Sequence, residues 1–153
     1  MQPSAISPQA SQKATLASVW LRLLAGVYDL LPLLGLWFLA AVLALAVTGG
    51  TLDTHTLGGK LLVQIPVLVF TATYFLVSWL RGGQTIGMKP WRLRIVRADG
   101  APLRFAHALL RFVVSLLSLA AAGAGYWWAL IDRDKRAWHD LAAGTLVVRL
   151  EKH

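Results

Sequence analysis

Three ionisable side chains of this 153-residue sequence, Arg22, Asp29 and Arg111, lie within or at the start of long apolar runs. A charged group at the centre of a membrane costs at least about 2.5–3.5 kcal/mol on insertion scales, so such a group usually has a partner and a function. A carboxylate at that depth can alternate between a paired and a protonated state, because burial favours its neutral form and a nearby arginine favours its charged form. This pattern indicates a charge-pairing or proton-binding site.

Each apolar run also carries one stripe of polar side chains. Arg22 and Asp29 are seven residues apart and lie on nearly the same face of a helix. The stripes of the second and third runs are Gln64, Thr71 and Ser78, and then His107, Arg111 and Ser115. If the stripes face one another, they form a single polar seam shielded from lipid, in which Asp29 meets Arg111.

A simpler interpretation of these stripes needs no functional site. Polar side chains in membrane helices commonly form interhelical hydrogen bonds, worth about 0.6–2 kcal/mol each. Arg22 can extend its guanidinium to the headgroups, and Arg111 lies close enough to the start of its run to reach the interface. His107 fits a hydrogen-bonded polar group better than a metal ligand. No nucleophile–base pair and no metal-ligand spacing stands out, so we expect neither an enzyme nor a metal site.

The runs that must position these groups are long enough to cross a membrane. They are Leu23–Val47 with 25 residues, Leu61–Leu80 with 20 and Phe105–Ile131 with 27, and the first membrane segment begins near residue 20. As helices, the first two would extend about 37 and 30 Å, and a hydrocarbon core is about 30 Å thick. Two transmembrane helices are therefore predicted, with a third membrane element.

Composition supports a membrane protein and argues against nucleic acid as a partner. Apolar residues make up 57% of the chain and charged residues 14%, against about 45–50% and 25% in soluble domains. The net charge is +8, but the cations flank the apolar runs, where anionic lipid headgroups would attract them. The chain contains no cysteine, so disulfides and thiolate sites are excluded. No cofactor is indicated.

Residues 81–104 form a basic loop of a different kind, with six cations and one anion. Within it, Trp91–Arg97 alternates apolar and basic residues as a half-buried strand does. The loop between the first two runs holds a single lysine, so the positive-inside rule places the N-terminus and residues 81–104 in the cytoplasm. This basic segment is predicted to lie at the membrane interface.

The third run has two competing interpretations, because glycines interrupt it. It could cross the membrane as one tilted helix, or bend at the glycines and return as a re-entrant hairpin. A crossing would export five cations, namely Arg133, Lys135, Arg136, Arg149 and Lys152. A re-entrant element keeps them inside, where Thr145–Leu150 can pair with Trp91–Arg97, and the positive-inside rule favours it.

The predicted fold is therefore an all-α membrane protein with two transmembrane helices, a third membrane helix or re-entrant hairpin, and a small interfacial β element. Residues 1–17 are predicted to be a disordered tail, because they are rich in Ser, Ala, Gln and Pro. Residues 18–150 form the membrane domain, and 151–153 form a second tail.

Four segments in the same order resemble the RDD family of bacterial membrane proteins, named for one arginine and two aspartates. They are WLRLLAGVYDLL (Trp20–Leu31), GGQTIGMKPWRLRIVRADGAPL (Gly82–Leu103), ALLRF (Ala108–Phe112) and IDRDKRAWHDLAAGTLVV (Ile131–Val148). Each is modest evidence alone, and four together are strong.

The resemblance assigns roles to individual residues. The family arginine corresponds to Arg22, the first aspartate to Asp29 and the second to Asp140, with Asp132 as a rival. The interfacial Gly-Gln-Thr-x-Gly motif corresponds to Gly83, Gln84, Thr85 and Gly87.

The resemblance implies a multi-pass protein of the bacterial inner membrane that takes part in transport of an unidentified ligand. We expect transport or a transport-accessory role, including cation/proton exchange at a buried aspartate paired with arginine, in a homo-oligomer. The alternative is a non-catalytic scaffold that binds lipid or another membrane protein. Co-purification and ion-flux measurements distinguish the two.

Overall fold

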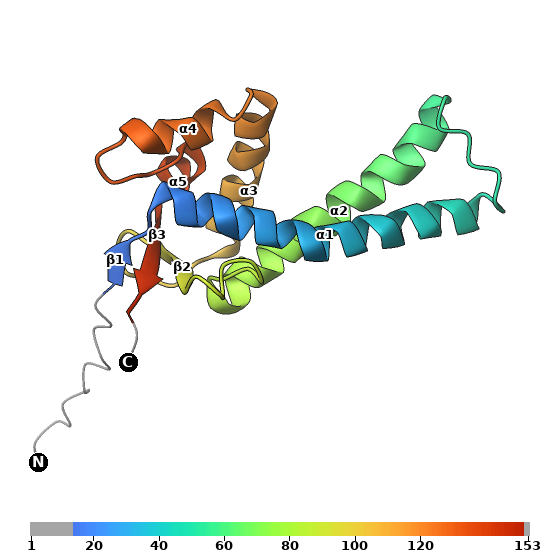
Figure 1. Cartoon of the computed structure of the whole chain (residues 1–153). Coiled ribbons are helices and arrows are strands. Elements are labelled where there is room, and N and C mark those ends of the chain that lie inside the picture. The colour runs from blue at the N-terminus through green and yellow to red at the C-terminus, as the bar shows by residue number, and fades with distance from the viewer. Residues whose placement is uncertain (1–13, 152–153) are drawn as a thin grey trace, which may run out of the picture.

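Two long helices dominate the computed structural model, which describes residues 14–151. Helix α1 spans Val19–Val47 and helix α2 spans Leu57–Gly82. They lie side by side and extend away from a head that contains the other elements (Figure 1). With 29 and 26 residues they are about 43 and 39 Å long. Both are long and apolar enough to cross a membrane, as the sequence predicts.

The outer faces of the two helices are apolar and exposed. Phe38 is 73% exposed and Leu57 is 74% exposed, although both are large hydrophobic residues. Between the helices, the indole Nε1 of Trp37 donates a hydrogen bond of 2.9 Å to the hydroxyl of Thr71. A surface of this kind suits lipid as solvent, with polar groups turned towards the helix partner.

The third apolar run is two helices, not one. Helix α3 spans Phe105–Ala120, helix α4 spans Ala124–Ile131, and their axes differ by 99°. Ala122 and Gly123 at the break both adopt positive φ, which ends α3 and turns the chain. With 16 residues, α3 extends about 24 Å, which is shorter than a hydrocarbon core of about 30 Å.

A three-stranded antiparallel sheet joins segments from the whole length of the chain. Its strands are β1 (Ala14–Leu16), β2 (Leu93–Arg97) and β3 (Thr145–Leu150), in the order β1-β3-β2. Ile95 pairs with Val147 in the register that joins β2 to β3. The predicted pairing of these two segments is confirmed.

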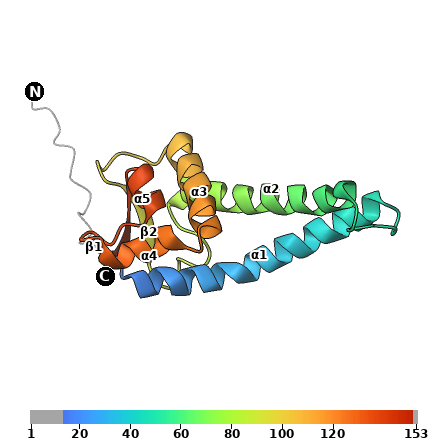
Figure 2. The ribbon, with the colours of Figure 1, turned by 90° about the horizontal axis from the view of Figure 1, so that it is seen from above.

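The sheet also decides how the third run is arranged. Strand β2 precedes α3 and β3 follows α4, so both flanks of residues 105–131 lie at the same end of the molecule (Figure 2). This arrangement agrees with the re-entrant alternative.

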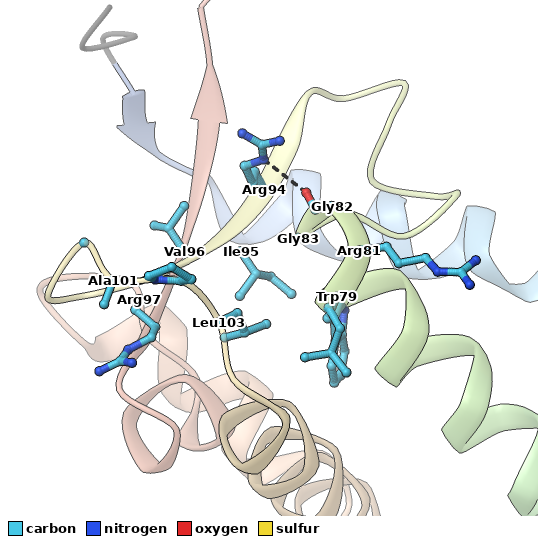
Figure 3. A pocket seen from close by; sticks show the side chains of 13 residues that line it. Trp79, Arg81, Gly82, Gly83, Arg94, Ile95, Val96, Arg97, Ala101 and Leu103 are labelled. Carbon is cyan, nitrogen blue, oxygen red and sulfur yellow. Dashed lines mark hydrogen bonds between the residues drawn. The ribbon is translucent and has the colours of Figure 1, made fainter. Parts of the chain in front are cut away.

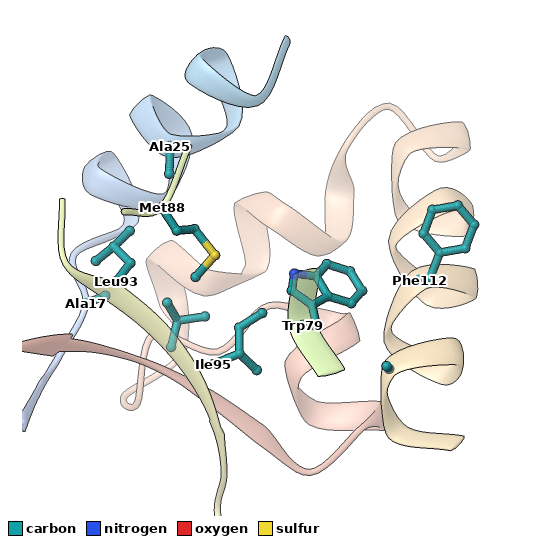
Figure 4. Packing of buried hydrophobic residues seen from close by; sticks show 9 residues of the cluster. Ala17, Ala25, Trp79, Met88, Leu93, Ile95 and Phe112 are labelled. Carbon is teal, nitrogen blue, oxygen red and sulfur yellow. The ribbon is translucent and has the colours of Figure 1, made fainter. Parts of the chain in front are cut away.

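A small apolar core lies where the long helices meet the head. Figure 4 shows Trp79, Met88, Ile95 and Phe112 around it, and the short helix α5 (Trp138–Ala142) completes the head. The members of this core are Ala17, Ala25, Trp79, Met88, Leu93, Ile95, Ala108, Phe112 and Val147. The core therefore packs α1, α2, α3 and the sheet together.

Two predicted boundaries are wrong. The tail was predicted to extend to residue 17, but residues 14–16 form β1 and Ala17 is buried, because β3 supplies a partner strand. Residues 1–13, 152 and 153 lie outside the described part. The strand predicted from Trp91 begins at Leu93, because Arg92 has φ of 54° and cannot continue an extended strand.

Candidate functional site

Asp29 is buried on α1, with 4% of its surface exposed. Its Oδ1 accepts hydrogen bonds from the Tyr74 hydroxyl at 2.5 Å and from the Gly87 backbone N–H at 2.8 Å. Its Oδ2 accepts one from the Thr85 hydroxyl at 2.6 Å. Within residues 14–151, no arginine or lysine forms an ion pair with this carboxylate. Neutral donors alone therefore hold it.

The loop that supplies two of these donors is fixed to β2. Gly83 ends α2 in the left-handed conformation, and its carbonyl accepts a hydrogen bond of 2.7 Å from the Ile95 N–H. The Gln84 amide donates to the Leu93 carbonyl at 2.6 Å. The Thr85 hydroxyl also accepts from the backbone of the turn that follows. The predicted motif of Gly83, Gln84, Thr85 and Gly87 is thus the structure that cradles Asp29.

Gly87 sits directly against the backbone of α1. A Cβ atom at this position would lie 2.1 Å from the Ala25 carbonyl oxygen and 2.7 Å from the Asp29 backbone nitrogen. Real Cβ atoms do not approach backbone atoms so closely, and only glycine brings its N–H within reach of the carboxylate. The requirement for glycine here is steric.

A second buried carboxylate, Asp140, lies between two arginines and is fully buried. Arg22 donates to its Oδ2 at 2.8 Å, and Arg111 donates to its Oδ1. The backbone N–H of Ala137 completes the set at 3.0 Å. Arg22 and Asp140 are 118 residues apart in the chain, so this cluster ties α1 to α5.

Arg111 extends the cluster to three further elements. Its guanidinium donates to the Thr145 hydroxyl on β3 at 2.7 Å and lies 5.3 Å from the centre of the Trp79 ring on α2. Its own helix is α3. A cation over an aromatic face is attracted by the ring, most strongly where water is excluded. One guanidinium therefore contacts α2, α5 and β3 together.

Burial and the positive charges of Arg22 and Arg111 set the pKa values of the neighbouring groups in this cluster. Burial by itself raises the pKa of Asp140, but the charges of Arg111 and Arg22 outweigh it and hold the pKa below its ordinary value. Burial first, and then the charge of Arg111, lower the pKa of His139 to about 3. With His139 neutral, the cluster carries a net charge of +1 at neutral pH.

Comparison with known proteins identifies the chain. The model of the RDD family matches residues 16–144, which is most of the sequence. The chain belongs to the RDD family. The resemblance predicted from the four segments is therefore confirmed, and with it a membrane protein. No curated protein and no solved structure matches the chain.

The three residues that the resemblance assigns to the family name fall into two buried sites. Arg22 and Asp140 pair with each other, and Asp29 anchors the Gly-Gln-Thr-x-Gly loop. Asp132, the rival for the second aspartate, only contacts Arg136 four residues further on. Asp132 is thus local and partly exposed, whereas Asp140 is buried between two arginines.

The predicted pairing of Asp29 with Arg111 is wrong, and so is the single polar seam. Helix α3 packs against α5, which turns Arg111 towards Asp140 in the head. Asp29 faces α2 and the loop after it. The RDD chain therefore has two polar clusters, and α1 contributes one residue to each.

The other seam residues have separate positions. Thr71 faces α1, as its bond with Trp37 shows, whereas Gln64 is exposed. Ser115 donates to the Phe112 carbonyl of its own helix. Ser78 and His107 are half-buried, and no hydrogen bond of the His107 Nδ1 is found in residues 14–151. These residues do not form the single seam that was predicted from the three stripes.

Sequence reasoning missed Tyr74 and Thr145. A signal for Tyr74 existed, because it lies three residues after Thr71 and so on the same face of α2. Thr145 had no comparable signal, because only the pairing of β3 brings it to Arg111.

Lowering the pH from 7 to 5 is expected to destabilise this RDD protein by on the order of 2 kcal/mol. The pKa of His139 is about 3 in the folded protein and 6.5 ordinarily, so the unfolded chain binds more protons between these values. The contribution of neutral His139 to the free energy of unfolding is fully present above pH 6.5 and is lost as the pH falls towards 3. Thermal unfolding in detergent at pH 7, 6 and 5 measures it. His139→Gln should weaken the dependence, and a constant wild-type Tm would contradict the prediction.

Proposed function

We propose that this RDD protein is a transport component of the bacterial inner membrane in which Asp29 binds a proton or a monovalent cation. The observation that carries the proposal is a buried carboxylate on a membrane-length helix, held only by neutral donors. An arginine partner would favour the charged form of such a carboxylate. Without one, binding a proton or a cation removes the cost of a buried charge.

The neighbouring side chains suit this chemistry. The hydroxyls of Tyr74 and Thr85 both point to the carboxylate, from 2.5 and 2.6 Å. A hydroxyl donates when the carboxylate is charged, and it can rotate to present its oxygen when a proton or cation is bound. Carboxylate and hydroxyl oxygens are the ligands that hard cations prefer.

Helices α1 and α2 cross the membrane in this proposal, and the head with its basic loop lies in the cytoplasm with the N-terminus. The cation excess of residues 81–104 supports that orientation. Two crossings and a short hairpin leave little room for a pathway within one chain. Transport is therefore proposed to need a homo-oligomer.

The test is proton flux driven by a cation gradient in liposomes that contain the purified protein. Wild type should show flux, and Asp29→Asn should reduce it to the leak of empty vesicles. Asp53→Asn is the matched control, because this exposed aspartate lies in the loop between α1 and α2, and it should retain flux. Equal flux in wild type and Asp29→Asn, with both proteins folded, would remove Asp29 from the mechanism.

A structural role is the second candidate, and the same hydrogen bonds favour it. All three bonds to Asp29 tie α2 or its following loop to α1, so the carboxylate could serve folding alone. The protein would then be a non-catalytic scaffold for lipid or another membrane protein. This candidate predicts no flux in wild type, a lower Tm for Asp29→Asn and reduced partner recovery in mild detergent.

A further inference from the structure

A groove of about 330 Å³ lies between the end of α2 and the β2 strand with its following turn. Figure 3 shows Trp79, Ile95 and Leu103 turned into this space from three different segments. Trp79 and Ile95 belong to the apolar core, so the floor of the groove is apolar and firmly packed. Neither buried carboxylate lines it.

The rim of the groove is basic. Arg81 in the last turn of α2 and Arg94 on β2 are both exposed, and neither has a carboxylate within 4 Å in the described part of the chain. Arg97 also lines the groove and pairs with Asp99 in the following turn. Arg94 is held in place because its Nε donates to the Gly82 carbonyl at 3.1 Å. Three cations and one paired anion leave a net charge of +2.

The position of the groove along α2 is as informative as its charge. Leu80 is the last large apolar residue of a helix long enough to span a membrane, and Arg81 follows it directly. The apolar floor therefore begins where the helix leaves the hydrocarbon, and the arginines lie at the depth of headgroups. A molecule that fits must therefore place a negative group at the arginines and an apolar part against the floor, on the hydrocarbon side.

We propose that this groove binds the headgroup of an anionic glycerophospholipid from the surrounding bilayer. The phosphate contacts Arg94 and Arg81, and the exposed Arg81 side chain, which extends away from the groove in Figure 3, turns inward to reach it. The glycerol with the first acyl carbons lies against Trp79 and Leu103. Charge complementarity favours an anionic head over a zwitterionic one. The apolar floor favours a lipid over free phosphate, which has nothing to place there. This site is independent of proton or cation binding at Asp29.

The test is native mass spectrometry of the full chain in detergent with added short-chain phosphatidylglycerol, phosphatidylcholine of the same chain length, or inorganic phosphate. Wild type should retain phosphatidylglycerol preferentially. Arg81→Gln should weaken that binding by about 5-fold, and Arg81→Gln/Arg94→Gln by on the order of 20-fold. The control is Arg133→Gln/Lys135→Gln, which removes the same charge from exposed positions between α4 and α5.

Each outcome decides the proposal. Weakened phosphatidylglycerol binding in the groove variants with unchanged binding in the control supports it. Equal weakening in the control pair overturns it in favour of general electrostatic attraction. Retention of phosphatidylcholine to the same extent, or competition by inorganic phosphate at equal concentration, also overturns it. Because Arg94 donates to Gly82, the single variant Arg81→Gln, which breaks no hydrogen bond in the described structure, shows that a loss is not caused by misfolding.

Discussion

Replacing Gly87 with alanine is expected to destabilise the folded protein by at least about 3 kcal/mol, at the upper end of what overpacking costs. The new methyl carbon would lie 2.1 Å from the carbonyl oxygen of Ala25 and 2.8 Å from the carboxyl carbon of Asp29. Both neighbours belong to α1, and the nearer is backbone, which cannot rotate away. The loop must therefore retreat, and Asp29 loses the Gly87 N–H and with it one of its three donors.

Thermal unfolding in detergent measures this effect, and Gly26→Ala supplies the control. Gly26 lies next to Ala25 on the same helix, but a Cβ there meets nothing within 4 Å. Alanine at this position should leave the Tm unchanged or raise it slightly, since alanine is the better helix former. If both variants unfold at the same temperature, the close contact between the loop and α1 is not formed.

Asp140→Asn is expected to lower the free energy of unfolding by about 3–5 kcal/mol, the cost of removing one partner from a buried ion pair. The variant leaves Arg22 and Arg111 close together with no anion between them. A buried guanidinium and a largely buried one repel each other, so the variant should also separate α1 from α5. Loss of folded protein in membranes is the most direct readout, followed by the Tm in detergent.

Asp132→Asn is the matched control for this change, because Asp132 contacts only Arg136 and is partly exposed, and it should have little effect. A double variant tests the interpretation further. Asp140→Asn combined with Arg22→Met removes both a cation and the anion, so it should be less unstable than Asp140→Asn alone. If the second substitution adds its full cost, repulsion between the arginines is not the cause.

The sequence contains most of the information about which segments enter the membrane. In lipid, a run of 20 uncharged residues such as Leu61–Leu80 satisfies its backbone hydrogen bonds by forming a helix. Helix α2 contains this run entirely. The alternation in Trp91–Arg97 likewise predicted a strand, and the cation distribution favoured its pairing with Thr145–Leu150. These features depend on the local pattern of apolar and charged residues, and that pattern can be read from a single sequence.

The partners of the charged residues could not be obtained in the same way. Arg111 and Asp29 have opposite charges and lie in the third and first apolar runs, so pairing them was the simplest assumption. The structure separates them because α3 packs against α5 at the head, and that contact depends on the bend at Gly123 and on the position of Asp140. A face of a helix is visible in a sequence, whereas the neighbour it meets is decided by packing across the whole fold.

The order of strands in the sheet has a consequence for biosynthesis. Strands β1 and β2 do not touch each other, and each pairs only with β3, which the ribosome makes after both. Arg22 and Arg111 are likewise synthesised before Asp140. During translation, α1 and α2 can therefore enter the bilayer while two strands and two arginines still await their partners. Residues 138–150 supply both the strand and the carboxylate, so the head can close only after they have been made.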